Sequence, residues 1–252
     1  MSEIQALLDR NRAGAAEGQR VWWDYRAWLT ALQQGPLAEI TVPALEELED
    51  RWAGDGGIAR AAVADVGRNN AVSLLVASMA WGFGSRPYGP ARTARMLATP
   101  YVAVVLAEIA EAAQAGAQDG FSALFRDGKA RVAGLSIAMG SKLIYFAAGG
   151  LATESGDPLV YDRNVHWALL TLEGGWPQAP DPGKRMYPRD YDTYVSRIDG
   201  YAVDFGLSRS DVEVTLFDAA TWLRQRRRLA EIEQRVPATL GATPQAPARP
   251  LR

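Results

Sequence analysis

The 252-residue chain contains no cysteine and a single histidine, His166. The absence of cysteine excludes disulfides, thiol nucleophiles and zinc or iron–sulfur sites built on thiolates. One histidine cannot build a histidine-rich metal site, and it argues against a Ser-His-Asp triad. We therefore expect neither a metal nor another cofactor.

The chain also lacks long apolar runs and an excess of basic charge. No stretch of about 18 apolar residues predicts a membrane span, and Met1–Ile4 lacks the basic-then-apolar pattern of a signal peptide. A cytoplasmic, nucleoid-associated protein without membrane contact is the expectation. The formal net charge of −2 argues against a strongly basic nucleic-acid-binding domain, although a local basic face could still contact DNA.

Apolar residues are abundant and recur at helical spacing. They make up 48% of the chain, enough for one large domain or for two small lobes that share a cleft. Helical periodicity is present in many segments, among them 21–32, 58–66, 69–81, 99–117 and 191–205, and no segment alternates as a strand does. The sequence therefore predicts an all-α domain over 1–236. The proline- and alanine-rich segment 237–252 is expected to be a disordered tail.

One stretch combines a lysine and an aspartate in an apolar setting. Leu135–Ala148 predicts a turn that enters an apolar helix with Lys142 in its first turn, and Asp162 follows 20 residues later at the start of another helix. A free lysine, with a pKa of about 10.4, is a poor nucleophile at neutral pH. Burial and the positive end of a helix both disfavour the charged form of a lysine. Lys142 is therefore a candidate nucleophile, and Asp162 is either a helix cap or a catalytic group.

Two short motifs in this stretch resemble those of a known family. Gly140-Ser141-Lys142 and Pro158-Leu159-Val160-Tyr161-Asp162 are similar to elements of the helix-hairpin-helix DNA glycosylases, in particular the archaeal and bacterial 8-oxoguanine branch. There, a hairpin ending in Gly-x-Lys leads into the helix of the catalytic lysine, and a Pro-x-x-x-Asp element carries the catalytic aspartate. The usual hairpin, Leu-Pro-Gly-Val-Gly, is reduced here to its last glycine. The resemblance implies two helical lobes around a cleft for DNA and for one base.

The resemblance also implies an activity. The chain would be a DNA glycosylase with lyase activity at apurinic or apyrimidinic sites, acting as a monomer in base excision repair, with 8-oxoguanine as the first expected substrate. Its partner would be double-stranded DNA with one base extruded from the stack. Lys142 would displace the base and form a Schiff base with the sugar. Asp162 would stabilise the positive charge that develops on the sugar.

Further residues fit a base-binding slot. Phe146 lies one helical turn after Lys142, and Phe146 and Trp222 could sandwich the extruded base, because base–aromatic stacking contributes about 1–3 kcal/mol. Asp218 could accept hydrogen bonds from its Watson–Crick edge. For the two aromatic residues, packing in the core is the alternative.

Other residues fit contacts to DNA. The loop 82–90 carries Arg86 and Tyr88, with Arg92 just after it. This pattern fits either a DNA-facing wedge or a helix connection with solvated arginines. Backbone amides from Ser136 to Gly140 could bind a phosphate, as in the resembled family.

Two further positions have local interpretations. His166, one turn after Asp162, could orient that aspartate or touch DNA, or simply lie on a helix surface. A capping box with Ser210 at the cap and Glu213 three residues later is predicted to start the last helix.

Three alternatives stay open. The same chemistry could serve another modified base, including hypermodified phage bases in a defence role. The fold could instead be a catalytically silent DNA-binding module, which salt-sensitive binding without Schiff-base chemistry would indicate. A small-molecule enzyme with a Ser141–Lys142 centre is a third alternative, but the sequence has no phosphate-binding loop and no nucleotide fingerprint that would support it.

Overall fold

The computed structural model describes residues 3–8, 14–52, 56–126, 129–152, 154–172 and 186–221, and these are mostly helical. The all-α prediction is confirmed. Residues 209–221 are helical to the end of the described chain. The preceding helices are α1 (Glu3–Leu8), α2 (Ala15–Gly18), α3 (Tyr25–Leu32), α4 (Ala38–Trp52), α5 (Arg60–Gly67), α6 (Ala71–Phe83), α7 (Gly89–Leu97), α8 (Val102–Ala115), α9 (Ala117–Leu124), α10 (Ile137–Ala147), α11 (Arg163–Leu172) and α12 (Pro188–Phe205).

Two short strand pairs interrupt the helices. β1 (Arg20–Val21) pairs antiparallel with β2 (Ile58–Ala59), and β3 (Phe125–Arg126) pairs with β4 (Lys129–Ala130). The helices predicted over 21–32 and 58–66 therefore begin later than expected. Asp24 caps α3 by accepting from Ala27 N at 3.1 Å, and the residues before this cap are free to pair with a distant strand.

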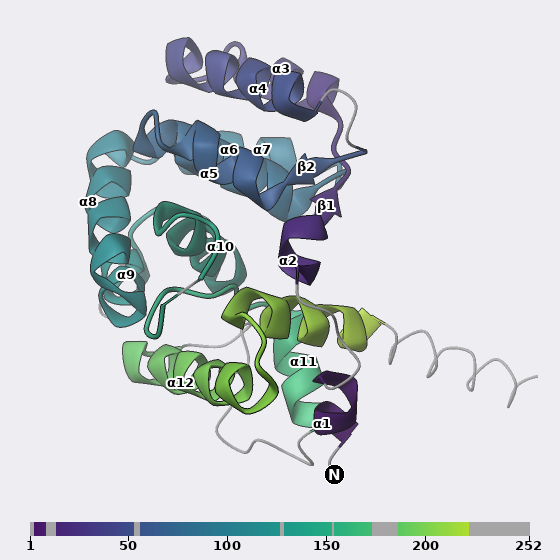
Figure 1. The fold of residues 1–252 in the computed structure, drawn as a ribbon. Coiled ribbons are helices and arrows are strands. Elements are labelled where there is room, and N and C mark those ends of the chain that lie inside the picture. The colour runs from purple at the N-terminus through teal and green to yellow at the C-terminus, as the bar shows by residue number, and fades with distance from the viewer. Residues whose placement is uncertain are drawn as a thin grey trace, which may run out of the picture.

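The helices form two groups around a central helix (Figure 1). The upper group contains α3 to α7, the lower group contains α1, α11, α12 and the helix at 209–221, and α8 and α9 connect the two along one side. The centre is occupied by α10, which packs against α5, α6, α8 and α9. The helix that carries Lys142 is thus packed between helices of the upper group and the two connecting helices.

The helix predicted over 69–81 is confirmed as a core helix. All residues of α6 except Ala71 and Gly82 are buried, and Asn70 caps it by accepting from Ser73 N at 2.8 Å. Within the described residues, no single helix has the length and apolar character needed to cross a membrane. Only α7 and α8 meet that length and composition criterion together, as a pair bent by 100°.

The helix at 209–221 begins on a different cap from the predicted one. Ser208 is the cap residue, since its Oγ accepts from Asp211 N at 3.0 Å and donates to the Asp211 carboxylate at 2.8 Å. The predicted capping box of Ser210 and Glu213 is wrong by two positions, because both side chains bind distant elements instead. Ser210 Oγ lies 3.1 Å from Tyr145 Oη.

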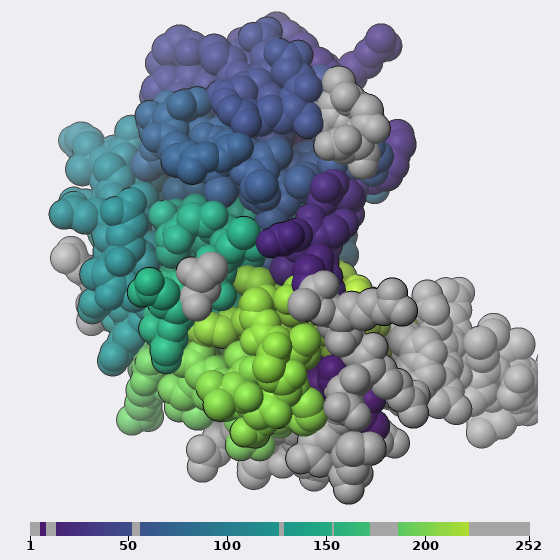
Figure 2. All heavy atoms as spheres, viewed as in Figure 1, coloured from purple at the N-terminus to yellow at the C-terminus, as the bar shows by residue number. Residues whose placement is uncertain are grey.

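The short helix α2 is held between the two groups. The Asp211 carboxylate accepts hydrogen bonds from Gly14 N at 3.1 Å and from Ala16 N at 2.9 Å, at the start of α2. In the space-filling view, α2 lies against both the upper helices and the helix at 209–221 (Figure 2). The start of α2 is therefore bonded to the helix at 209–221, while α2 also packs against α5.

Candidate active site

Lys142 is buried in the second turn of α10, not in the first turn as predicted. Its side chain is only 5% exposed. The side chain runs back toward the amino end of the helix, as long helical side chains do, so that Nζ donates to Ala138 O at 3.3 Å and to Asp162 Oδ2 at 3.2 Å. The two residues singled out by the sequence thus form one buried ion pair.

The two oxygens of Asp162 have different partners. Oδ1 accepts from Asn164 N at 2.9 Å and from Val165 N at 3.2 Å, which caps α11. Oδ2 accepts from Lys142 Nζ. Burial works to raise the pKa of Asp162, but the Lys142 charge and the backbone N–H donors outweigh it and hold the pKa below the ordinary 3.8. The aspartate is therefore a helix cap and the partner of Lys142 at the same time.

The depressed pKa of Asp162 predicts a specific loss of stability in acid. A carboxyl whose pKa is lower in the folded state stabilises the fold above its unfolded pKa, and this contribution disappears as pH falls through the folded value. The gap in unfolding free energy between wild type and Asp162→Asn should be constant from pH 7 to about pH 4 and shrink below it. Urea unfolding at pH 7, 5, 4 and 3 measures this. A gap that is equal at pH 3 and pH 7 would contradict the assignment.

Ser141 and Gly82 hold the pair in place. Ser141 Oγ accepts from Tyr161 N at 2.9 Å, which ties α10 to the segment that ends in Asp162. A Cβ atom at Gly82 of α6 would lie 2.9 Å from Lys142 Cδ and 3.1 Å from Met139 Sδ. The Lys142 stem therefore lies directly against the α6 backbone, and it can do so because position 82 has no side chain.

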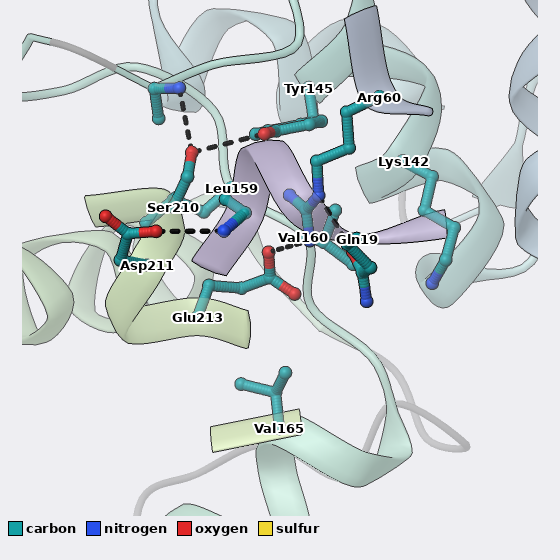
Figure 3. Close-up of polar contacts among 12 residues, drawn as sticks. Gln19, Arg60, Lys142, Tyr145, Leu159, Val160, Val165, Ser210, Asp211 and Glu213 are labelled. Carbon is teal, nitrogen blue, oxygen red and sulfur yellow. Dashed lines mark hydrogen bonds and ion pairs between the residues drawn. The ribbon is translucent and has the colours of Figure 1, made fainter. Parts of the chain in front are cut away.

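A second buried ion pair lies beside Lys142 (Figure 3). Arg60 Nη2 donates to Glu213 Oε2 at 2.7 Å, and both side chains are 1% exposed. Arg60 Nε also donates to Gln19 Oε1 at 2.8 Å. Sequence reasoning missed this cluster because its two charged members are 153 positions apart. The one available signal was an arginine within the apolar run 58–66.

The loop after α6 gathers three predicted DNA contacts into one exposed cluster. Arg86 Nη1 donates to Tyr88 Oη at 3.0 Å, and the Arg92 guanidinium lies over the Tyr88 ring at 5.2 Å. Tyr88 is 45% exposed and packs edge-on against Phe83. Because this loop follows α6 directly, it begins close to Gly82 and the Lys142 stem.

The residues predicted to form a phosphate-binding hairpin belong to α10 itself. Ser136 is the N-cap of α10 and accepts from Met139 N at 3.4 Å, while Gly140 lies inside the helix. The turn that precedes α10 closes earlier, where Leu135 N donates to Val132 O at 3.1 Å. The absence of a side chain at Gly140 serves packing, because a Cβ atom there would lie 3.1 Å from Leu124 Cδ1 of α9.

Two further predictions need correction. His166 is not on the helix surface, since it is 6% exposed and its Nδ1 lies 2.8 Å from Tyr161 Oη, which does not fit a DNA contact. Phe146 is 2% exposed and packs edge-on against Trp81 at 5.2 Å between ring centres. Core packing, the alternative interpretation, describes Phe146 in this structure because α6 covers its ring.

The two late candidates lie near the end of the described chain. Asp218 is on the exposed side of the helix at 209–221; partial burial raises its pKa, and the Arg60 charge opposes that rise. Trp222 lies outside the described residues. Across the parts of the chain that the structure describes, no group of three or more histidine and carboxylate side chains is placed to hold a metal ion.

Comparison with known families relates the chain to 8-oxoguanine DNA glycosylases. The family model described as "Putative 8-oxoguanine DNA glycosylase OGG-like protein" matches residues 14–217. This range contains both buried ion pairs and ends just before Asp218. No curated protein and no solved structure matches the chain.

Proposed function

Because the chain belongs to the OGG-like family of 8-oxoguanine DNA glycosylases, we propose that it removes an oxidised purine, 8-oxoguanine in the first place, and then cleaves the strand through a Schiff base on Lys142. Membership of this family implies that the protein binds DNA. The observation that carries the proposal is the buried contact of 3.2 Å between Lys142 Nζ and Asp162 Oδ2. We propose that the protein acts as a monomer in base excision repair.

The proposed reaction begins with extrusion of the damaged nucleotide from the duplex. Lys142 first gives its ammonium proton to solvent. Its free amine then attacks the sugar C1′, the bond from C1′ to the base breaks, and the electron pair leaves with the base. The base then takes up the proton that the new C1′–nitrogen bond releases. Opening of the sugar ring converts this bond to a Schiff base, with the ring oxygen taking the electron pair and a proton. Loss of a C2′ proton expels the 3′ phosphate and cleaves the strand.

Asp162 is suited to stabilise the charge in this sequence. Its carboxylate is ionised because its pKa lies below 3.8, and two backbone N–H groups fix its orientation. A fixed charge that is already in place when positive charge develops on the sugar stabilises the transition state without reorganisation. The cap geometry therefore supports the proposed catalytic role.

DNA contacts are proposed for the loop after α6 and for the start of α10. Arg86 at the Tyr88 hydroxyl and Arg92 over the Tyr88 ring would bind phosphates, and the amino end of α10 at Ser136 would face another phosphate. Asp218 and Trp222 are retained as proposed base-binding residues. Phe146 is not retained, since its ring is covered by Trp81.

Gly82→Ala should slow the reaction without unfolding the protein. The new methyl group would meet Lys142 Cδ and Met139 Sδ, both on flexible side chains, so the fold adapts while Lys142 moves away from Asp162. A displacement of Lys142 by up to about 1 Å predicts a loss of about 10- to 100-fold in the single-turnover excision rate. Gly200→Ala in α12 is the matched control, because a Cβ atom there meets nothing within 4 Å. Equal excision rates in the two variants would contradict the proposal that the close approach of Gly82 to Lys142 positions the amine.

Borohydride trapping tests the proposed function directly. Wild-type protein is incubated with a duplex that carries one 8-oxoguanine opposite cytosine, with undamaged and uracil-containing duplexes as controls. A covalent adduct with the oxidised duplex alone is expected. Salt-sensitive binding without an adduct or base release on any duplex would favour a silent DNA-binding module. Release of a different base from a panel of modified duplexes would keep the chemistry and change the substrate.

A further inference from the structure

The Arg60–Glu213 pair joins the elements that surround Lys142. Besides its bonds to Glu213 and Gln19, the Arg60 guanidinium lies 5.1 Å from the Trp81 ring and 5.0 Å from the Tyr145 ring. Trp81 is on α6 and Tyr145 is on α10. One buried cation therefore contacts both helices of the reaction centre while it is bonded to the helix at 209–221.

Both aromatic rings lie close in the chain to residues that position Lys142. Trp81 directly precedes Gly82, whose backbone supports Lys142 Cδ. Tyr145 lies three residues after Lys142 on α10, and its hydroxyl is within 3.1 Å of Ser210 Oγ. Figure 3 shows Arg60 reaching toward Glu213, with Gln19 and Lys142 to one side and Tyr145 to the other. A shift of Arg60 would thus change how α6 and α10 meet at Lys142.

The two buried ion pairs also act on each other electrostatically. Burial raises the pKa of Glu213, and the Arg60 charge opposes that rise. The negative charge of Asp162 also raises this pKa, whereas the positive charge of Lys142 lowers it. Burial works against the charge of Arg60, but Glu213 and Tyr145 outweigh it and raise the Arg60 pKa. At 2.7 Å the pair is a guanidinium facing a carboxylate. The reaction centre thus contains four interacting charges in place of two.

Stability alone does not account for a charged pair at this place. Moving two charges out of water is costly, and replacing a buried ion pair by apolar residues of similar volume is often neutral or stabilising. Removing only one partner is strongly destabilising, because a buried charge is left unpaired. The effect of the pair on the reaction can therefore be separated from its effect on the fold by changing both residues together.

We propose that the Arg60–Glu213 pair is a positioning device for Lys142, which sets the contact between α6 and α10 so that Nζ faces Asp162. The inference rests on the proposed function, since its effect is measured as base excision. Arg60 and Glu213 touch neither the reacting amine nor its partner in the structure. They act through Trp81, Gly82 and Tyr145.

The test is the double variant Arg60→Met/Glu213→Leu, measured in three assays. We expect a melting temperature close to that of wild type, and a Kd within about 3-fold for a duplex that carries a stable abasic-site analogue. Single-turnover excision should fall about 30- to 100-fold, because a misplacement of about 1 Å can slow a reaction by 10²-fold. Arg51→Met/Asp65→Leu is the matched control, since this half-exposed pair joins α4 to the same helix α5 and should leave excision unchanged.

A second variant keeps the inference testable if the double variant does not fold. Arg60→Lys retains a cation for Glu213 but loses the planar group that lies over Trp81 and Tyr145. It should fold, bind the abasic-site duplex as wild type does, and excise at least 10-fold more slowly. Wild-type excision in either folded variant would overturn the inference and leave the proposed function intact. Failure of wild-type protein to excise any base would overturn the proposed function, and this inference with it.

Discussion

Lys142→Gln should abolish borohydride trapping and slow base excision by about 10⁶-fold, the loss expected when the nucleophile of a catalytic unit is removed. Glutamine has no amine that could form a Schiff base. Its amide can still donate to Asp162 Oδ2, which Lys142 Nζ now contacts at 3.2 Å, so the fold should remain intact. The measurement is the covalent adduct on denaturing gels, together with base release under single-turnover conditions.

Lys129→Gln is the matched control for this experiment. Lys129 is an exposed lysine of β4, so the same substitution there should leave both trapping and excision unchanged. An adduct that persists in Lys142→Gln would assign the Schiff base to another amine. Loss of trapping in both variants would indicate a general effect on DNA binding, which a Kd for the abasic-site duplex would reveal.

Asp162→Asn should reduce excision by about 10²- to 10³-fold, the range seen when one electrostatic contact to a transition state is removed. Asparagine is as good a helix cap as aspartate, so Asn164 N and Val165 N keep an acceptor. Only the negative charge beside Lys142 is lost. We expect the protein to lose about 3–5 kcal/mol of stability, because the buried Lys142 charge is left without its counter-ion, and the Kd for DNA to change by less than about 3-fold.

Asp24→Asn provides the same substitution at a cap without a lysine. Asp24 caps α3 by accepting from Ala27 N at 3.1 Å and is exposed, so its replacement should change neither excision nor DNA affinity. If Asp162→Asn and Asp24→Asn had equal excision rates, Asp162 would be a cap alone. Equal losses of binding and excision in Asp162→Asn would likewise argue against a role in the chemical step.

The sequence alone determined the helices and the two residues of the proposed reaction. Helical periodicity predicted an all-α fold, and the length of the apolar segment 69–81 predicted a buried helix there, because buried strands are usually shorter. The pairing of Lys142 with Asp162 could also be predicted, since both belong to one short stretch whose order and spacing resemble a known motif. Because only the rest of one helix and a loop separate Lys142 from Asp162 in the chain, the two side chains cannot lie far apart.

Only the tertiary structure decided which neighbours surround that pair. The sequence suggested a surface position for His166 and a stacking position for Phe146, yet both are buried, because periodicity predicts which residues share a helix face but not which distant helix covers that face. The bond from Arg60 to Glu213 depends on a contact across 153 positions. The fit of Lys142 against Gly82 likewise depends on where α6 and α10 cross. Long-range packing of this kind has no local pattern, and so the contact between Lys142 and Asp162 could be predicted from the chain while the contacts that support it could not.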